Sequence, residues 1–182
     1  TSPKLHGADA PFALVDHQHF SSPTRTKTWF HLGPVGEESG KWQALDLSEE
    51  YWLGDGSLLE HSSAINSFLQ SLPSRRARRD ALRALRGSML RTELYAVDGT
   101  PLESRPYTIG EHAYDLREES PFSIGDETRA HIFFPHASAQ RTTQWERGSG
   151  PLTTFSFTSD YDRYGQPRRA LGIACPRGWK AL

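Results

Sequence analysis

Two histidines near the start of the chain have the spacing of metal ligands: His17 and His19, directly after Asp16. On a strand, residues two apart project to one face, so two imidazoles and a carboxylate could bind one metal ion. The chain has eight histidines, so this spacing also arises by chance, and no His-Glu-x-x-His pattern supplies further ligands. We therefore predict no metal and no cofactor, and keep a metal-dependent enzyme using His17 and His19 as one alternative.

Glu111 beside His112, and the neighbouring Glu118 and Glu119, are the candidates for proton transfer. General acid–base catalysis needs both groups within reach of one substrate. Adjacent residues of a strand point to opposite faces, so Glu111 and His112 cannot readily act together. Glu118 and Glu119 precede Ser120-Pro121 in a predicted loop, where solvated charge is the usual explanation. Since the sequence also lacks P-loop, GxGxxG and GxSxG strings, we predict no catalytic residue and no enzymatic activity.

Composition favours a one-sided sheet over a thick enzyme core. The 182 residues suit one domain, yet only 36% are hydrophobic and the mean hydropathy is −0.63. With 15 glycines and 12 prolines, much of the chain must form turns, loops or sheet with one wet face. The 21 basic residues nearly balance the 22 acidic ones, so no strong field attracts phosphates and we expect no nucleic-acid partner.

The single cysteine, Cys175, excludes an internal disulfide and a thiolate metal cluster. We interpret it as a small buried hydrophobe beside a strand at 171–174. No stretch approaches the ~20 apolar residues of a membrane-spanning helix, so we expect no direct membrane insertion.

Residues 89–116 have the strongest strand pattern of the chain. Side chains alternate with the two-residue period of a half-buried strand, Leu90, Leu94 and Ala96 against Arg91, Glu93 and Val97. Asp98-Gly99 is a dipeptide that tight turns favour, so the segment is predicted to be a strand, a turn centred on Asp98-Gly99, and a second strand.

The remaining pattern predicts mostly antiparallel sheet with an inserted helical segment at about 45–86. Apolar residues at helical spacing, with capping and stop residues, predict helices at 45–53, 61–72 and 74–86. The last of these has a heavily basic face but lacks aromatic residues for stacking bases, so we interpret that face as solvated. Residues 1–24 are predicted to be an irregular lead-in, and 25–182 a single β-rich segment. Its other strands are predicted at 25–32, 130–134, 141–146, 152–158 and 168–174.

Five segments, in order, resemble one family of proteins. LRTELYAVDGTP and RPYTIGEHAYDLRE, in 90–118, closely resemble the middle shell region of the B components of Tc-type insecticidal toxin complexes, which also occurs in SpvB-like and Rhs (YD-repeat) toxins. TKTWFHLG, EEYWLGDGSLL and FTSDYDRYGQPRRA are similar to further elements of that family. The resemblance runs from about residue 26 to 175 and is specific in order and spacing rather than in any single motif.

This resemblance implies a mainly β fold, in which a very long polypeptide winds antiparallel hairpins into a shell around a C-terminal cytotoxic domain. It implies that the chain is a piece of a larger secreted toxin, without cofactors. The implied partners are the rest of the shell polypeptide, the enclosed toxic domain and other toxin-complex subunits. The family-signature residues, implied to be structural, are Trp29, His31, Gly54, Asp55, Arg91, Glu93, Tyr95, Asp98, Gly99, Tyr107, Glu111, His112, Tyr161, Asp162 and Gly165.

A free-standing β-sandwich that binds carbohydrate or protein is the other alternative. It would require a row of tryptophans exposed on one sheet, whereas packing between hairpins is the commoner use of such residues. The Tyr161-Asp162-x-x-Gly165 unit also has an ordinary explanation. It suits a loop in which the aspartate accepts backbone N–H bonds and glycine supplies a positive φ. The tryptophans concerned are Trp29, Trp42, Trp52, Trp145 and Trp179.

Overall fold

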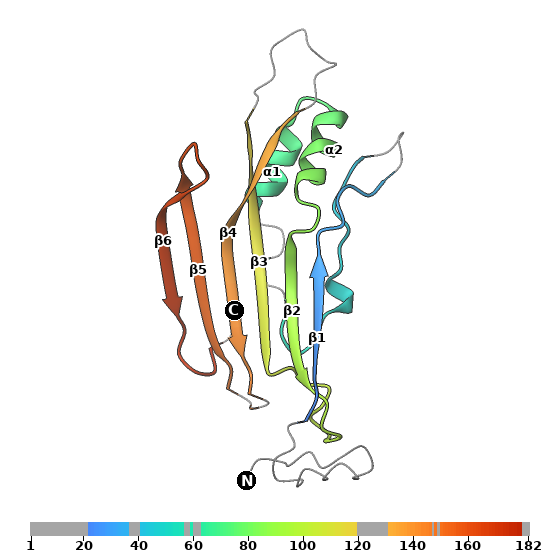
Figure 1. The fold of residues 1–182 in the computed structure, drawn as a ribbon, viewed down its shortest axis with the longest axis vertical. Helices are drawn as coiled ribbons and strands as arrows, with labels where there is room; N and C mark the ends of the chain where they lie inside the picture. The colour runs from blue at the N-terminus through green and yellow to red at the C-terminus, as the bar shows by residue number, and fades with distance from the viewer. Residues whose placement is uncertain are drawn as a thin grey trace, which may run out of the picture.

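Six strands form one antiparallel sheet in which every strand pairs with its neighbours in the sequence (Figure 1). The strands are β1 (Thr24–Phe30), β2 (Met89–Ala96), β3 (Thr108–Glu118), β4 (Phe133–Gln144), β5 (Leu152–Tyr161) and β6 (Pro167–Ala174). A 3₁₀ turn, η2 (Ser48–Glu50), and two helices, α1 (Ser63–Ser71) and α2 (Arg75–Ala84), lie between β1 and β2. The prediction of a mainly antiparallel β fold with a short helical insertion is therefore confirmed. The computed structural model describes residues 22–36, 41–56, 59, 63–119, 131–146, 148 and 150–179.

One long strand, β4, replaces the two strands predicted at 130–134 and 141–146. It pairs with β3 along its whole length, from Phe133 to Gln144, but with β5 only from Ala139 onwards. Its first half is thus unpaired on the β5 side, and an edge position tolerates Pro135, which lacks an N–H donor. The proline and the small polar residues after it interrupt the strand pattern in the sequence, although the strand itself continues.

The connection between β2 and β3 is a wide loop over residues 97–107, not the predicted tight turn. Gly99 has a φ of 70°, but Asp98 uses its carboxylate to accept bonds from the N–H and hydroxyl of Thr100. Pro101 and Pro106 lack a backbone N–H, so these two loop positions cannot donate a ladder hydrogen bond. The prediction of a turn at Asp98-Gly99 placed the chain reversal between β2 and β3 correctly, but the connecting loop is longer than predicted.

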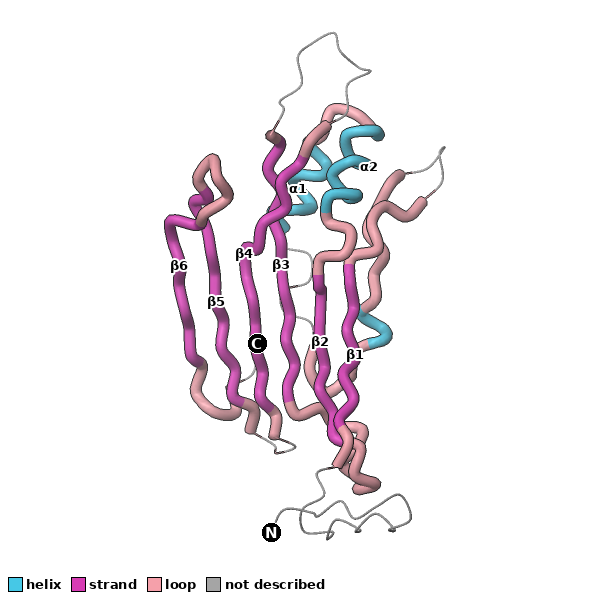
Figure 2. Tube along the Cα trace, viewed as in Figure 1, coloured by secondary structure: helices cyan, strands magenta, loops and turns pink. Residues whose placement is uncertain are grey.

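The helices pack against the part of β3 and β4 that extends beyond β2 (Figure 2). The Ser74 side chain, at the predicted start of the helix, caps α2 by accepting a bond of 3.0 Å from the N–H of Ala77. The predicted helices at 61–72 and 74–86 are therefore confirmed. They share one hydrophobic cluster with the sheet, formed by Ile65, Ala81, Leu85, Leu116 and Phe133.

The helix predicted at 45–53 is reduced to the turn η2. The Asp46 side chain accepts from the N–H of Ser48, which starts the turn, but Tyr51 is already extended. Tyr51 packs edge-on against Trp29 with ring centroids 5.0 Å apart, and both belong to a second buried cluster with Leu90. Burial of this aromatic pair on the sheet outweighs the local helical pattern.

Some predictions fall outside the part of the chain that the structure describes. These include the lead-in before residue 22, and with it Asp16, His17 and His19. Within the described ranges, no helix is long and apolar enough to cross a membrane.

Candidate functional site: a buried charge network

Four charged side chains lie buried side by side on one face of β2, β3 and β4. The register places Arg91 opposite Glu111, and Glu111 opposite Arg141. Glu93 follows Arg91 on the same face of β2, because strand side chains alternate. All four side chains are at most 3% exposed. Together with Asp55 they are called the charge network below.

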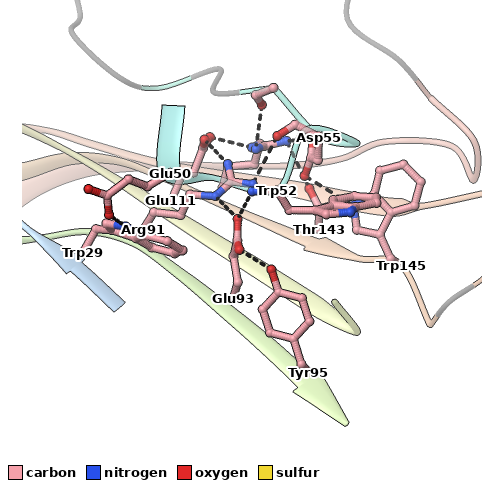
Figure 3. A network of polar contacts seen from close by, with 12 residues as sticks. Trp29, Glu50, Trp52, Asp55, Arg91, Glu93, Tyr95, Glu111, Thr143 and Trp145 are labelled. Carbon is pink, nitrogen blue, oxygen red and sulfur yellow. Dashed lines mark hydrogen bonds and ion pairs between the residues drawn. The ribbon is translucent and has the colours of Figure 1, made fainter. Parts of the chain in front are cut away.

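The pairing is complementary atom by atom (Figure 3). Glu111 accepts from Arg91 Nη1 at 2.8 Å through Oε1, and from Arg141 Nε at 2.7 Å through Oε2. Arg91 Nε donates to Glu93 Oε1 at 2.8 Å, and Arg141 Nη1 to Asp55 Oδ1 at 2.8 Å. Ionic hydrogen bonds of this kind offset the cost of taking charges out of water only where, as here, geometry and remaining donors are satisfied.

The network fixes the loop at 51–56 onto the sheet. Arg91 Nη2 donates to the backbone carbonyl of Asp55, and Arg141 Nη2 to that of Gly56, both at 3.1 Å. In return, the N–H of Trp52 donates to Glu93 Oε1 at 2.9 Å. The loop and the strands therefore satisfy one another's buried polar groups. Separating the loop from the sheet would leave buried charged groups without hydrogen-bond partners.

Aromatic rings close the network on its flanks. The Arg91 guanidinium lies 4.8 Å from the Tyr51 ring centroid, and the Trp145 indole N–H donates to Asp55 Oδ2 at 3.3 Å. Trp52 meets Trp145 edge-on with centroids 5.2 Å apart. A Cβ at Gly54 would lie 2.2 Å from the Trp52 ring, so this position requires glycine or a shifted indole. These contacts exclude water and strengthen the ionic bonds inside.

Two groups in or beside the charge network, Tyr95 and Arg141, have shifted pKa values. Burial raises the pKa of the Tyr95 hydroxyl, and its hydrogen bond to Glu93 raises it further. Burial by itself would lower the pKa of Arg141, but Glu111 and Asp55 outweigh it, so that pKa is raised. Both shifts keep the protonated forms that the hydrogen bonds require.

The charged face of β2 is buried, which the two-residue period of the sequence does not indicate. Arg91 and Glu93 are wholly buried, and Leu90 and Ala96 are buried as well, whereas Leu94 is 37% exposed. The alternation is therefore correct, but the strand is largely buried on both faces rather than half-buried. The physical reason is the covering loop, which supplies partners to the charged face.

Six of the residues singled out in the sequence meet in or beside the network, although they are far apart in the chain: Trp29, Asp55, Arg91, Glu93, Tyr95 and Glu111. Arg141 and Thr143 also take part and were not singled out, whereas Trp52 and Trp145 were considered only as packing residues. The Arg-x-Thr-x-Trp alternation at 141–145 was the available signal, but nothing in it specifies the partners. That these residues are a signature of the family stays a prediction.

His31 and His112 lie away from the network, and both line a cavity of about 270 Å³ next to α1 and α2. Tyr114 also lines this cavity and meets His31 edge-on, with centroids 6.1 Å apart. Burial lowers the pKa of His112, with Glu111 opposing the shift. The side chains of Glu111 and His112 thus lie in different environments, the charge network and the cavity, as expected for neighbours on a strand.

The Tyr161-Asp162-x-x-Gly165 unit forms the turn between β5 and β6. Asp162 Oδ1 accepts from the N–H groups of Tyr164 at 2.8 Å and Gln166 at 3.0 Å, and these bonds lower the pKa of Asp162. Gly165 has a φ of 80°, and a Cβ there would lie 2.7 Å from the Phe134 ring. The ordinary explanation of this motif, a loop organised by aspartate and glycine, therefore accounts for its geometry.

The other predicted pairs have structural surroundings. Glu118 ends β3, rather than lying in a loop, and its carboxylate is 2.7 Å from His131 Nδ1, while Glu119 contacts Arg117. Tyr107 joins the strand ends, since its N–H donates to the carbonyl of Leu94 at 2.7 Å. Across the described residues, no group of three or more His, Cys, Asp or Glu side chains could hold a metal ion. Of the five tryptophans, Trp29 and Trp145 are buried and the other three are half-buried, so they form no exposed row.

The family model of the insecticide toxin TcdB middle/C-terminal region matches residues 80–181. Among solved structures, the Tc holotoxin pore of Photorhabdus luminescens, with a TccC3 mutation, is 27% identical with a TM-score of 0.52; the match covers 61% of this chain and 5% of that one. The crystal structures of TcdB2-TccC3 and TcdB2-TccC3-Cdc42 are each 20% identical with a TM-score of 0.61, over 94% of this chain and 8% of theirs. This chain spans less than a tenth of the solved chains. No curated protein matches it.

Proposed function

Because this chain belongs to the family of the insecticide toxin TcdB middle/C-terminal region, we propose that it is one wall segment of a toxin-complex shell. In this proposal the chain is part of a much longer polypeptide, and its hairpins continue a sheet that winds around a C-terminal cytotoxic domain. The wall keeps that domain from solvent, proteases and the producing cell until delivery. The observation that carries the proposal is the family match over β2 to β6, the strands that hold the charge network.

The physical task of such a segment is to keep a thin sheet in shape. A single sheet has little core of its own, so loops and helices must fix its faces. The charge network does this over β2, β3 and β4, because its hydrogen bonds specify the register of three strands and the path of the loop at once. Its carboxylates and guanidinium groups are occupied and buried, an arrangement suited to structure rather than to binding a substrate.

We further propose that the partners are the enclosed toxic domain and other toxin-complex subunits. The relatives support this, since TcdB2-TccC3 names a complex of two toxin components and the other structure is a holotoxin. The chain is proposed to act outside the producing cell as part of a secreted toxin. The turn at Tyr161-Asp162-x-x-Gly165 supports a relation to the YD-repeat, Rhs and SpvB-like shells named by the sequence resemblance.

Limited proteolysis of the whole toxin tests the proposal. The toxin that contains this chain is treated with a protease of broad specificity, and survival of its C-terminal segment is followed by mass spectrometry. The proposal predicts that the segment survives in the native toxin and is cut rapidly once Arg141→Met opens the wall. Arg83→Met, the same change on an exposed arginine of α2, is the matched control and should leave the segment protected. Rapid cleavage in the native toxin would show that nothing is enclosed.

A further inference from the structure

The cavity of about 270 Å³ next to α1 and α2 lies apart from the charge network and has no role in the proposed wall. It is bounded by both helices, by β3 and by the segment at 41–44; the helices lie beside β3 in Figure 1. Its apolar lining includes Leu82, Leu85 and Leu90, all of which are buried. The volume is close to the lower end of small-molecule pockets, about 300 Å³, and such pockets are mostly apolar with a few polar groups.

The charged side chains that line the cavity are all basic. They are Lys41 and Arg78, and none of the described lining residues is aspartate or glutamate. Arg78 is half-buried, and its Nε donates to the carbonyl of Leu69 at 3.0 Å. Among the described residues no carboxylate pairs with Arg78, whereas the buried Arg91 and Arg141 each have carboxylate partners. Because a charge removed from water is costly without a counter-charge, the cavity favours an anion.

A second, more open hollow adjoins the cavity at Trp42, whose indole lines both. The other residues that line this hollow are three arginines of α2, Arg75, Arg76 and Arg79. Arg79 Nη2 is 3.5 Å from Asp80, yet Arg79 Nε is buried and makes no hydrogen bond within the described ranges. Positive charge is therefore concentrated beside the cavity on the side of Trp42, where an anionic group would find donors.

We propose that the cavity binds a single-chain aliphatic carboxylate. Its chain lies among the buried leucines, and its carboxylate lies on the side of Trp42, within reach of Arg78 and Lys41. A cation would be repelled by these two side chains, and a neutral chain would leave Arg78 without a counter-charge. The indole of Trp42 suits the boundary between the two parts of the ligand, because one end of a tryptophan is apolar and the other polar. The site is made of residues of this chain alone, so the inference does not depend on the wall.

Photoaffinity labelling of the native polypeptide that contains this chain tests the inference. The probe is octanoate with a diazirine at the far end of its chain, and mass spectrometry identifies the peptides to which irradiation attaches it. We expect saturable labelling of the peptides that carry Leu82, Leu85 and Leu90. Absence of saturable labelling there at about 1 mM probe, the weakest binding worth considering, would overturn the inference. That result would also follow if another part of the polypeptide filled the cavity.

Competition against the probe separates the two parts of the ligand. Burial of each CH₂ group should strengthen binding about fourfold, so unlabelled octanoate should compete roughly 15-fold better than hexanoate. Octanol, which has the chain without the charge, should compete at least about 10-fold less well than octanoate, because it cannot form the ionic hydrogen bond to Arg78. Equal competition by octanol and octanoate would overturn the assignment of an anion.

Substitutions locate the binding site. Arg78→Gln should weaken octanoate at least about 10-fold, and Lys41→Gln, at an exposed position, about threefold. Arg83→Gln, on the exposed face of the same helix, is the matched control and should leave binding unchanged. Because Arg78 also bonds the carbonyl of Leu69, Arg78→Lys, which keeps the charge, distinguishes loss of charge from loss of packing and should bind better than Arg78→Gln.

Asn66→Phe gives an independent readout, since Asn66 lines the cavity from an exposed position of α1 and a ring there should obstruct entry. We expect it to abolish labelling of the cavity peptides. Unchanged octanoate binding in Asn66→Phe and Arg78→Gln would overturn the inference. The proteolysis experiment on the toxic segment has no bearing on this outcome, so failure of the wall and failure of the carboxylate site are distinguishable.

Discussion

Removing one guanidinium from the charge network should destabilise the protein far more than removing one from the surface. Arg141→Met keeps the length of the side chain but leaves Glu111 Oε2 and Asp55 Oδ1 without their arginine donor, and frees the loop carbonyl of Gly56. Breaking a buried ion pair by deleting one partner costs about 3–5 kcal/mol, because the remaining charge stays buried. That is a large part of the roughly 5–15 kcal/mol that stabilises a domain.

Thermal and urea unfolding of the 182-residue chain measures the effect. At about 2–4 °C per kcal/mol for a chain of this size, the melting temperature of Arg141→Met should fall by about 6–20 °C. Arg83→Met, on the exposed face of α2, should change the unfolding free energy by less than about 1 kcal/mol. The reasoning is refuted if Arg141→Met is as stable as the control.

A double-mutant cycle separates the pair from the rest of the network. If Glu111 and Arg141 stabilise each other as the 2.7 Å bond indicates, Glu111→Met combined with Arg141→Met should cost less than the sum of the single changes, by about 0.5–3 kcal/mol. Simple additivity would mean that the two side chains act independently. The double variant should still be less stable than the wild type, because Arg91 loses Glu111 and Asp55 loses Arg141 in it.

Three further predictions concern the parts around the network. Gly165→Ala should destabilise by about 1–3 kcal/mol in chemical unfolding, because of its positive φ and its contact with Phe134, whereas Gly172→Ala should be within about 0.5 kcal/mol. Ser74→Ala should cost about 1 kcal/mol and shorten α2 in circular dichroism, while a change too small to measure would contradict its capping role. The pKa of His112 is lowered below its ordinary 6.5, so its contribution to stability is present above pH 6.5 and lost as the pH falls through its folded pKa. His112→Gln should flatten that decline in unfolding measurements between pH 7 and 4, and an unchanged profile would exclude His112 as its source.

Local rules predict much of this fold from the sequence. The helix over Arg75–Ala84 follows from its apolar spacing and from Ser74, and the strands at 24–30, 89–96 and 152–161 follow from the two-residue period. Where the rules fail, a longer-range contact decides. The segment at 45–53 has a helical pattern, but burial of Tyr51 beside Trp29 stabilises an extended chain instead.

The charge network could be predicted only in part. Charged residues on a strand ordinarily indicate its wet face, so the period at 89–97 conceals that Arg91 and Glu93 are buried. Burial follows from partners that lie far away in the chain: Asp55 is 36 residues from Arg91 and 86 from Arg141. No local pattern specifies such pairings. Family resemblance pointed to Asp55, Arg91, Glu93 and Glu111 as a set, but it could not indicate that Arg141 completes it.

The mass of the native polypeptide that contains this chain shows whether the chain is a wall segment of a larger shell. It would be isolated from its source with an antibody raised against the 182-residue chain, and its mass measured under denaturing conditions. A wall segment of a shell predicts one covalent polypeptide many times heavier than 20.5 kDa, with this sequence in its interior. A native polypeptide near 20.5 kDa would rule out a wall segment, because a single six-stranded sheet cannot by itself enclose a toxic domain.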